Sequence, residues 1–115
     1  MTTKATHSVK VGDIFVTQHA SFYQVVKATA KTVTVRPIED KFVGYADEYG
    51  WERMYQPLPG TFCENGYWPR EVCESGKRCT VRDFTVARVR PQIKITDYQD
   101  AWLWDGTPGV LDTYS

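Results

Sequence analysis

Two short apolar runs joined by a tight turn constrain the fold more than any other part of this chain. The segment FYQVVKAT, residues 22–29, has apolar side chains on both of its alternating faces, as a strand in a closed or doubly covered sheet does. The segment TVTVRPI, residues 32–38, alternates strictly between valine and polar residues until Pro37, which we expect to limit that strand. Because both runs are rich in β-branched residues and lie close together, they predict an antiparallel hairpin.

Further short strands are predicted on both sides of this hairpin. IFVT at 14–17 precedes it, and CTVRDFTVARVR at 79–90, IKI at 93–95 and AWLW at 101–104 follow it. Helical periodicity is nearly absent, so the pattern predicts an all-β fold. The opening VGDIF, followed by a strand and then a hairpin, favours a small SH3-like barrel, with an OB-like barrel as the alternative.

The length of 115 residues suits one domain, which we place at 9–115 after a flexible tail at 1–8. Residues 39–52 are interpreted as an acidic loop that leads into a short strand near WERMYQP. Residues 61–79 contain Asn-Gly, Ser-Gly and a proline in a small space, and are interpreted as a long irregular excursion with at most one helical turn.

The charge of the chain and its lack of recognisable targeting segments indicate which partners and which compartment to expect. The chain has 14 basic and 14 acidic residues, with basic excess in 1–38 and 70–94 and acidic excess in 39–52 and 95–115. Zero net charge is unusual for a nucleic-acid binder, so we expect these blocks to pair with one another or with a partner. No apolar run resembles a signal peptide or a membrane span, and the odd number of cysteines fits a reduced compartment. We therefore expect a soluble cytoplasmic protein with no membrane partner.

Three segments together resemble a known family. VKVGDIF with FYQVVKATAKTVTVRPI, the segment MYQPLPGTF, and AWLWDGTP with a nearby tyrosine are similar to a family of small bacteriophage and prophage proteins, most of them without an assigned function. The resemblance covers the two ends of the chain, and the cysteine-rich segment 63–79 matches no pattern of the family. It implies an origin in a phage or prophage and does not imply a reaction.

Cysteine chemistry is the first candidate for a site. Cys63, Cys73 and Cys79 could bind zinc with His7 or His19, but their spacings of ten and six differ from the short pairs of structural zinc sites. A nucleophilic cysteine needs an oriented base, and no local signature surrounds any of the three. There is also no glycine-rich phosphate-binding motif. Ordinary thiols, without metal or cofactor, are the favoured interpretation.

A basic stretch mixed with aromatic residues is the candidate nucleic-acid site. Small β-barrels bind single strands through cations and stacking rings, and Arg88 and Arg90 would share one strand face. The alternative is a solvated face that pairs with the acidic residues 39–52. The candidate residues are Tyr67, Trp68, Arg70, Lys77, Arg78, Arg82, Arg88, Arg90 and Lys94.

Aromatic residues in predicted loops are the candidate protein interface. Trp51, Tyr45 and Tyr49 lie in predicted loops, where side chains are often exposed. Exposed aromatic rings are typical of interface hot spots. The alternative is that these rings cover the ends of the barrel. In AWLWDG, Trp102 and Trp104 would share one strand face, and we interpret them as a packed surface that holds the C-terminal strand rather than as a binding platform.

Taken with the resemblance, these patterns predict a non-enzymatic phage or prophage accessory protein in the cytoplasm of an infected or lysogenic bacterium. It is expected to bind a host or phage protein, and antagonism of a host process is a further hypothesis that rests on analogy. Nucleic-acid binding through residues 70–94 is the alternative.

Overall fold

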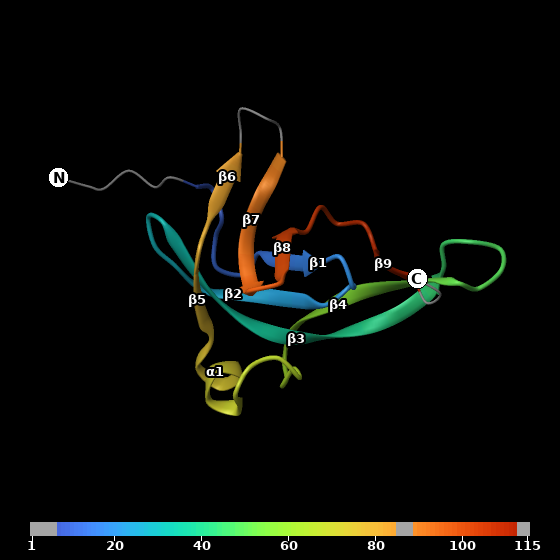
Figure 1. Cartoon of the computed structure of the whole chain (residues 1–115), viewed down its shortest axis with the longest axis horizontal. Coiled ribbons are helices and arrows are strands. Elements are labelled where there is room, and N and C mark those ends of the chain that lie inside the picture. The colour runs from blue at the N-terminus through green and yellow to red at the C-terminus, as the bar shows by residue number, and fades with distance from the viewer. Residues whose placement is uncertain (1–6, 85–88, 113–115) are drawn as a thin grey trace.

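The strands of this chain form one curled antiparallel sheet (Figure 1), in a computed structural model that describes residues 7–84 and 89–112. The elements in chain order are β1 (Ile14–Thr17), β2 (Phe22–Ala28), β3 (Thr32–Tyr45), β4 (Glu52–Phe62), α1 (Arg70–Ser75), β5 (Lys77–Thr80), β6 (Arg82–Phe84), β7 (Val89–Thr96), β8 (Gln99–Leu103) and β9 (Gly109–Asp112). The expected tail at 1–8 falls mostly on residues 1–6, which lie outside the described ranges. His7 is hydrogen-bonded to the carbonyl of Thr29.

The predicted β2–β3 hairpin is confirmed. Phe22 pairs with Ile38 and Val25 pairs with Val35, so the alternating valines of β3 face the interior. The predicted turn at 29–31 is closed by the backbone N–H of Thr29, which donates to the carbonyl of Thr32 at 2.8 Å. Local alternation and turn residues therefore determine this part of the fold.

The strand pairings lead around a ring. The hydrogen-bonded order is β6-β7-β8-β1-β2-β3, and β5 pairs with the edge of β3 opposite β2. β5, which pairs with β3, continues through Val81 into β6, which is the first strand of this order. Within the described ranges, the two ends of the curled sheet are therefore connected by the chain and not by strand pairing. The all-β barrel expected from the sequence is thus confirmed.

Two clusters of buried side chains fill the barrel. The larger cluster includes Phe15, Tyr23, Ile93 and Ile95, together with the inward valines of β2 and β3. The smaller cluster comprises Ile14, Phe22 and Ile38. The neighbouring residues Phe22 and Tyr23 are both buried, one in each cluster, so β2 is covered on both faces there, as its apolar residues on both faces predicted.

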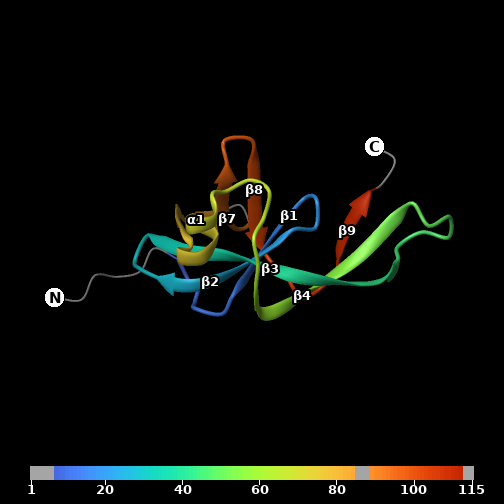
Figure 2. The same ribbon diagram turned by 90° about the horizontal axis from the view of Figure 1, so that it is seen from below.

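The expectation that Pro37 limits its strand is wrong, and the acidic loop expected at 39–52 is confined to residues 46–51. β3 continues through Pro37 to Tyr45, and the Pro37 carbonyl accepts a hydrogen bond from the N–H of Cys63 at 3.0 Å. The acidic residues therefore lie largely on strands. The distal halves of β3 and β4 form a long hairpin that projects from the barrel, with β9 paired to β4 (Figure 2).

The expected irregular excursion at 61–79 is shorter and more ordered than the sequence indicates. β4 extends to Phe62, α1 occupies Arg70–Ser75 and β5 begins at Lys77, so irregular structure is confined mainly to the residues between β4 and α1. Asn65 orders that loop, because its Oδ1 accepts hydrogen bonds from the N–H groups of Tyr67 and Trp68. The Arg36 Nε also donates to the Cys73 carbonyl at 2.9 Å, which ties α1 to β3.

The AWLWDG segment supplies β8 and the residues that follow it. Ala101 is fully buried in the larger cluster, and Trp104 packs against the smaller cluster with its ring at 85° to that of Phe22, centroids 6.3 Å apart. Trp102 is half-buried. Trp104 is also half-buried, and the interpretation of the two tryptophans as a packed surface is supported for Trp104, which contacts the smaller cluster.

Candidate binding surfaces

The acidic block 39–52 and the basic block 70–94 of the sequence lie apart in the fold. The basic residues of β5, β6 and β7 are at one end of the molecule, and the tip of the β3–β4 hairpin is at the other (Figure 1). Among the described residues, the ion pairs join Arg70 to Glu64 and Glu74, and Arg90 to Asp105. Arg90 and Asp105 thus join the basic block 70–94 to the acidic block 95–115, as expected, whereas the alternative that the basic stretch pairs with residues 39–52 is not observed among the described residues.

A row of aromatic rings follows the projecting hairpin, and we call it the aromatic arm. It begins at Tyr55, which packs against the smaller core cluster, and ends at the hairpin tip. The rings touch in two groups: Phe42 lies 5.9 Å from Tyr55 and 5.2 Å from Tyr45, and Tyr49 lies 5.5 Å from Trp51, all between centroids. The arm comprises Phe42, Tyr45, Tyr49, Trp51 and Tyr55.

An extra residue in β3 places Phe42, Tyr45 and Tyr55 on one face of the hairpin. Phe42 pairs with Tyr55, and the register then shifts so that Gly44, not Val43, pairs with Met54. Tyr45 consequently lies opposite Arg53, on the same face as Phe42, where regular alternation would have put it on the other face. Gly44 has a φ of +140°, a conformation that side chains disfavour. The bulge is therefore built into the sequence at Gly44.

The tip of the arm is held in place by hydrogen bonds. The Asp47 Oδ1 accepts from the backbone N–H groups of Trp51 at 3.0 Å and Glu52 at 3.1 Å, and the N–H of Ala46 donates to the Glu52 carbonyl. Gly50 fits beneath the Tyr45 ring, since a β-carbon there would lie 3.5 Å from Tyr45 Cε1. The rings are thus presented by an ordered loop, which lowers the entropy lost on binding.

The three residues predicted as a protein interface are brought together on this arm. The exposed fractions are 52% for Tyr45, 71% for Tyr49 and 51% for Trp51. Phe42 and Tyr55 join them, although they were not identified from the sequence. Phe42 was missed because residues 39–52 were expected to form a loop, whereas Tyr55 lies in the predicted strand WERMYQP and its exposure could not be told from the sequence.

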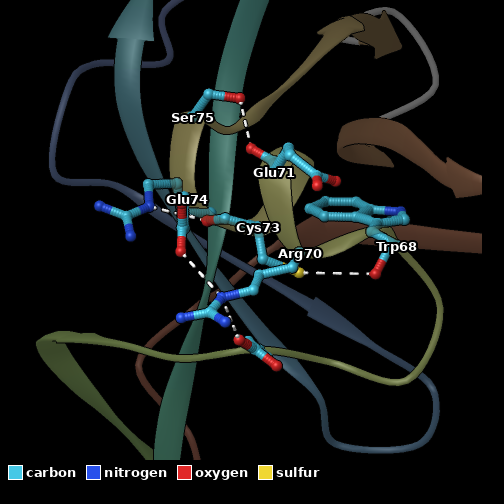
Figure 3. Close-up of polar contacts among 8 residues, drawn as sticks. Trp68, Arg70, Glu71, Cys73, Glu74 and Ser75 are labelled. Atoms are coloured by element: carbon cyan, nitrogen blue, oxygen red, sulfur yellow. Dashed lines mark hydrogen bonds and ion pairs between the residues drawn. The ribbon is translucent and has the colours of Figure 1, made fainter.

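The residues predicted as a nucleic-acid site do not form one surface. Trp68 is a core residue at 8% exposure, while its neighbour Tyr67 is 59% exposed. Arg70 is engaged by Glu64 and Glu74 on α1 and the preceding loop (Figure 3), and Arg90 donates to the Leu103 carbonyl beside Asp105. Arg88 lies outside the described residues. The predicted site is therefore wrong for Trp68, and Arg70 and Arg90 are held by local partners.

The remaining basic residues line an open groove between β5, β6 and β7, with a volume of about 280 Å³. Lys77 is half-buried in it. Its Nζ donates to the Ile95 carbonyl at 2.7 Å and lies 5.6 Å from the centroid of the Trp68 ring. The lining residues are Lys77, Arg78, Cys79, Thr80, Arg82, Lys94, Thr96 and Asp97.

The cysteines are separate thiols. Cys73 and Cys79 are buried, Cys63 is half-buried, and none of the three forms a disulfide. Burial raises the pKa of Cys63, with Glu39 contributing, and raises the pKa of Cys79 to about 11, which disfavours the thiolate. Within 7–84 and 89–112, no group of three or more His, Cys, Asp and Glu side chains is arranged to hold a metal ion.

In the described ranges, no helix has the length and hydropathy needed to cross a bilayer. The function of this chain has to be inferred from its two exposed surfaces, the aromatic arm and the basic groove. Comparison with protein-family models, curated proteins and solved structures finds no significant match to this chain.

Proposed function

We propose that this protein is a non-enzymatic binding protein whose aromatic arm docks onto a partner protein. The observation that carries the proposal is the set of aromatic rings, four of them exposed and touching in two groups, on a hairpin that projects from the barrel. Tyrosine, tryptophan and arginine are the residues most enriched at interface hot spots, and Arg53 lies opposite Tyr45 on the same face. Large exposed apolar patches on folded proteins commonly mark interaction sites.

Charge on the arm favours a basic partner. An acidic excess surrounds the rings, and within the described residues no ion pair joins it to the basic block of β5–β7. Complementary charge accelerates association, and cationic side chains also bind well against tyrosine and tryptophan rings. The charged residues of the arm are Glu39, Asp40, Asp47, Glu48 and Glu52, against Lys41 and Arg53.

The resemblance to phage and prophage proteins guides where the partner should be sought. We infer that it is a host or phage protein in the bacterial cytoplasm. The raised pKa values of Cys63 and Cys79 argue against either of these thiols as a nucleophile, because a reactive cysteine needs a lowered pKa.

Truncation of two arm rings is expected to abolish partner capture. In Tyr45→Ala with Trp51→Ala, the loss of two hot-spot side chains should weaken the complex by roughly 1,000-fold, since such residues contribute about 2 kcal/mol each, or ~30-fold per residue. Wild-type and variant proteins would be immobilised and exposed to nuclease-treated bacterial lysate. The captured partner would then be purified and its Kd measured by calorimetry.

Tyr67→Ala is the matched control, because it removes an exposed ring from a different part of the molecule. It should capture the same partner with unchanged affinity, and all variants should retain the wild-type Tm. If the double variant captures the same proteins as the wild type, the aromatic arm is not the interface and the proposal fails. Raising the salt concentration should slow association if the partner is basic.

A further inference from the structure

The groove between β5, β6 and β7 contains cations without acidic partners. Arg78, Arg82 and Lys94 are exposed, and within the described residues none of them forms an ion pair. Arg78 donates from Nε to the Thr32 hydroxyl, which orients its side chain. Asp97 is the acidic member of the lining set, and it lies on the turn that closes one end of the groove.

Strand geometry spaces these cations along the groove. Arg78, Thr80 and Arg82 are alternate residues of the continuous segment that forms β5 and β6, and alternate residues on a strand are about 7 Å apart. Lys94 and Thr96 line the groove from β7 in the same alternating way. The groove thus presents rows of cationic and hydroxyl groups, which are the usual side-chain partners of phosphate oxygens.

An exposed aromatic residue directly follows the groove-lining residues Thr96 and Asp97 in the chain. Tyr98 follows Asp97 in the turn between β7 and β8 and is 99% exposed, the largest exposure among the hydrophobic residues of the described ranges. Its backbone N–H donates to the Thr96 hydroxyl, which links the position of Tyr98 to a groove-lining residue. A fully exposed ring has no packing role in this chain, and it is available for stacking.

We propose that this groove binds a single strand of nucleic acid, with its phosphates along Arg78, Arg82 and Lys94 and an unpaired base on Tyr98. A cationic groove beside an exposed aromatic ring is the combination that recognises single strands without sequence preference. A duplex offers the same charge, but its bases are stacked on one another, and Tyr98 would add nothing to its binding. This site lies away from the aromatic arm and does not depend on the protein partner.

The test measures fluorescence polarisation of labelled oligo-dT and oligo-rU of about 12 nucleotides, within the usual site size of such grooves. The full-length protein should bind at low salt, with a logarithmic slope that shows release of several counterions. Tyr98→Ala should weaken binding about fivefold or more, because it removes one stacked base, whereas Tyr98→Phe should bind as the wild type does. Arg82→Gln should weaken binding and lower the salt slope by about 0.7.

Two further variants test whether binding depends on the charges of this groove or only on the net charge of the protein. Asp97→Asn removes the groove carboxylate and should tighten binding, whereas Lys41→Gln removes a positive charge from the arm and should leave binding unchanged. Tyr49→Ala is the matched control for Tyr98→Ala, since it removes an exposed tyrosine at the other end of the molecule. Absence of binding at micromolar protein, equal binding by Tyr98→Ala, or preference for a duplex of the same length would each overturn the proposal.

Discussion

Replacement of Trp68 by alanine is expected to lower the free energy of unfolding by about 3–5 kcal/mol. The Trp68 ring packs against Tyr23 with centroids 5.2 Å apart, and its Nε1 donates to the Ile95 carbonyl at 3.1 Å. Lys77 lies over the same ring. The side chain thus connects the loop before α1 to β2, β5 and β7, and its removal leaves a cavity at the base of the barrel.

Guanidinium denaturation followed by circular dichroism measures this effect. The adjacent substitution Tyr67→Ala should change stability by no more than about 0.5 kcal/mol, because that ring is exposed. Trp68→Phe should give an intermediate loss, since it keeps an aromatic ring against Tyr23 but not the hydrogen bond to Ile95. Equal stabilities of Trp68→Ala and Tyr67→Ala would show that Trp68 is not part of the core.

Stability is expected to fall steeply between about pH 9 and pH 12. Burial raises the pKa of Tyr23 to about 12, against a smaller opposing contribution from its hydrogen bond with Asn65, and burial raises the pKa of Cys79 to about 11 despite the nearby Lys77. Both groups keep their protons to higher pH when folded than when unfolded. Their contribution is therefore complete below the unfolded pKa values, 10.0 for Tyr23 and 9.0 for Cys79, and is lost as pH rises toward the folded values.

The size of the loss follows from about 1.4 kcal/mol per pKa unit, which gives about 2–3 kcal/mol for each group. Denaturant unfolding at intervals from pH 7 to 12 measures it. Tyr23→Phe should be less stable at neutral pH, because Asn65 loses the hydroxyl that it donates to, but its stability should decline less between pH 10 and 12. The same slope in the variant and the wild type over that interval would contradict the assignment to Tyr23.

The sequence predicts those parts of the fold that local pattern determines. The limits predicted for β1 are those observed, and the β2–β3 hairpin follows from alternating valines and a short turn. The continuation of β3 beyond Pro37 could not be predicted in this way. Residues 39–45 begin with three charged residues and lie outside the core, and they form a strand because β4 pairs with them, which is a contact with a later segment of the chain.

The candidate surfaces were only partly predictable for the same reason. Tyr45, Tyr49 and Trp51 could be identified because each lies next to a glycine, and the glycines predict a loop with exposed side chains from the local sequence alone. Trp68 has similar neighbours in sequence, yet it is buried through contacts with Tyr23 and Ile95. The groove combines β5, β6 and β7 with the turn at Tyr98, so neither its boundaries nor that ring could be found before the strand pairings were known.

The pairing of β1 with β8 has a consequence for how this barrel is made in a cell. Phe15 of β1 pairs with Leu103 of β8. The edge of β1 that does not pair with β2 therefore stays unpaired until almost the whole described chain has left the ribosome. Contacts between such distant segments slow folding, and an uncovered strand edge can pair with other chains. Aggregation of newly made protein should therefore be greatest for nascent chains that end before β8, and a chaperone that shields β1 would act during that interval.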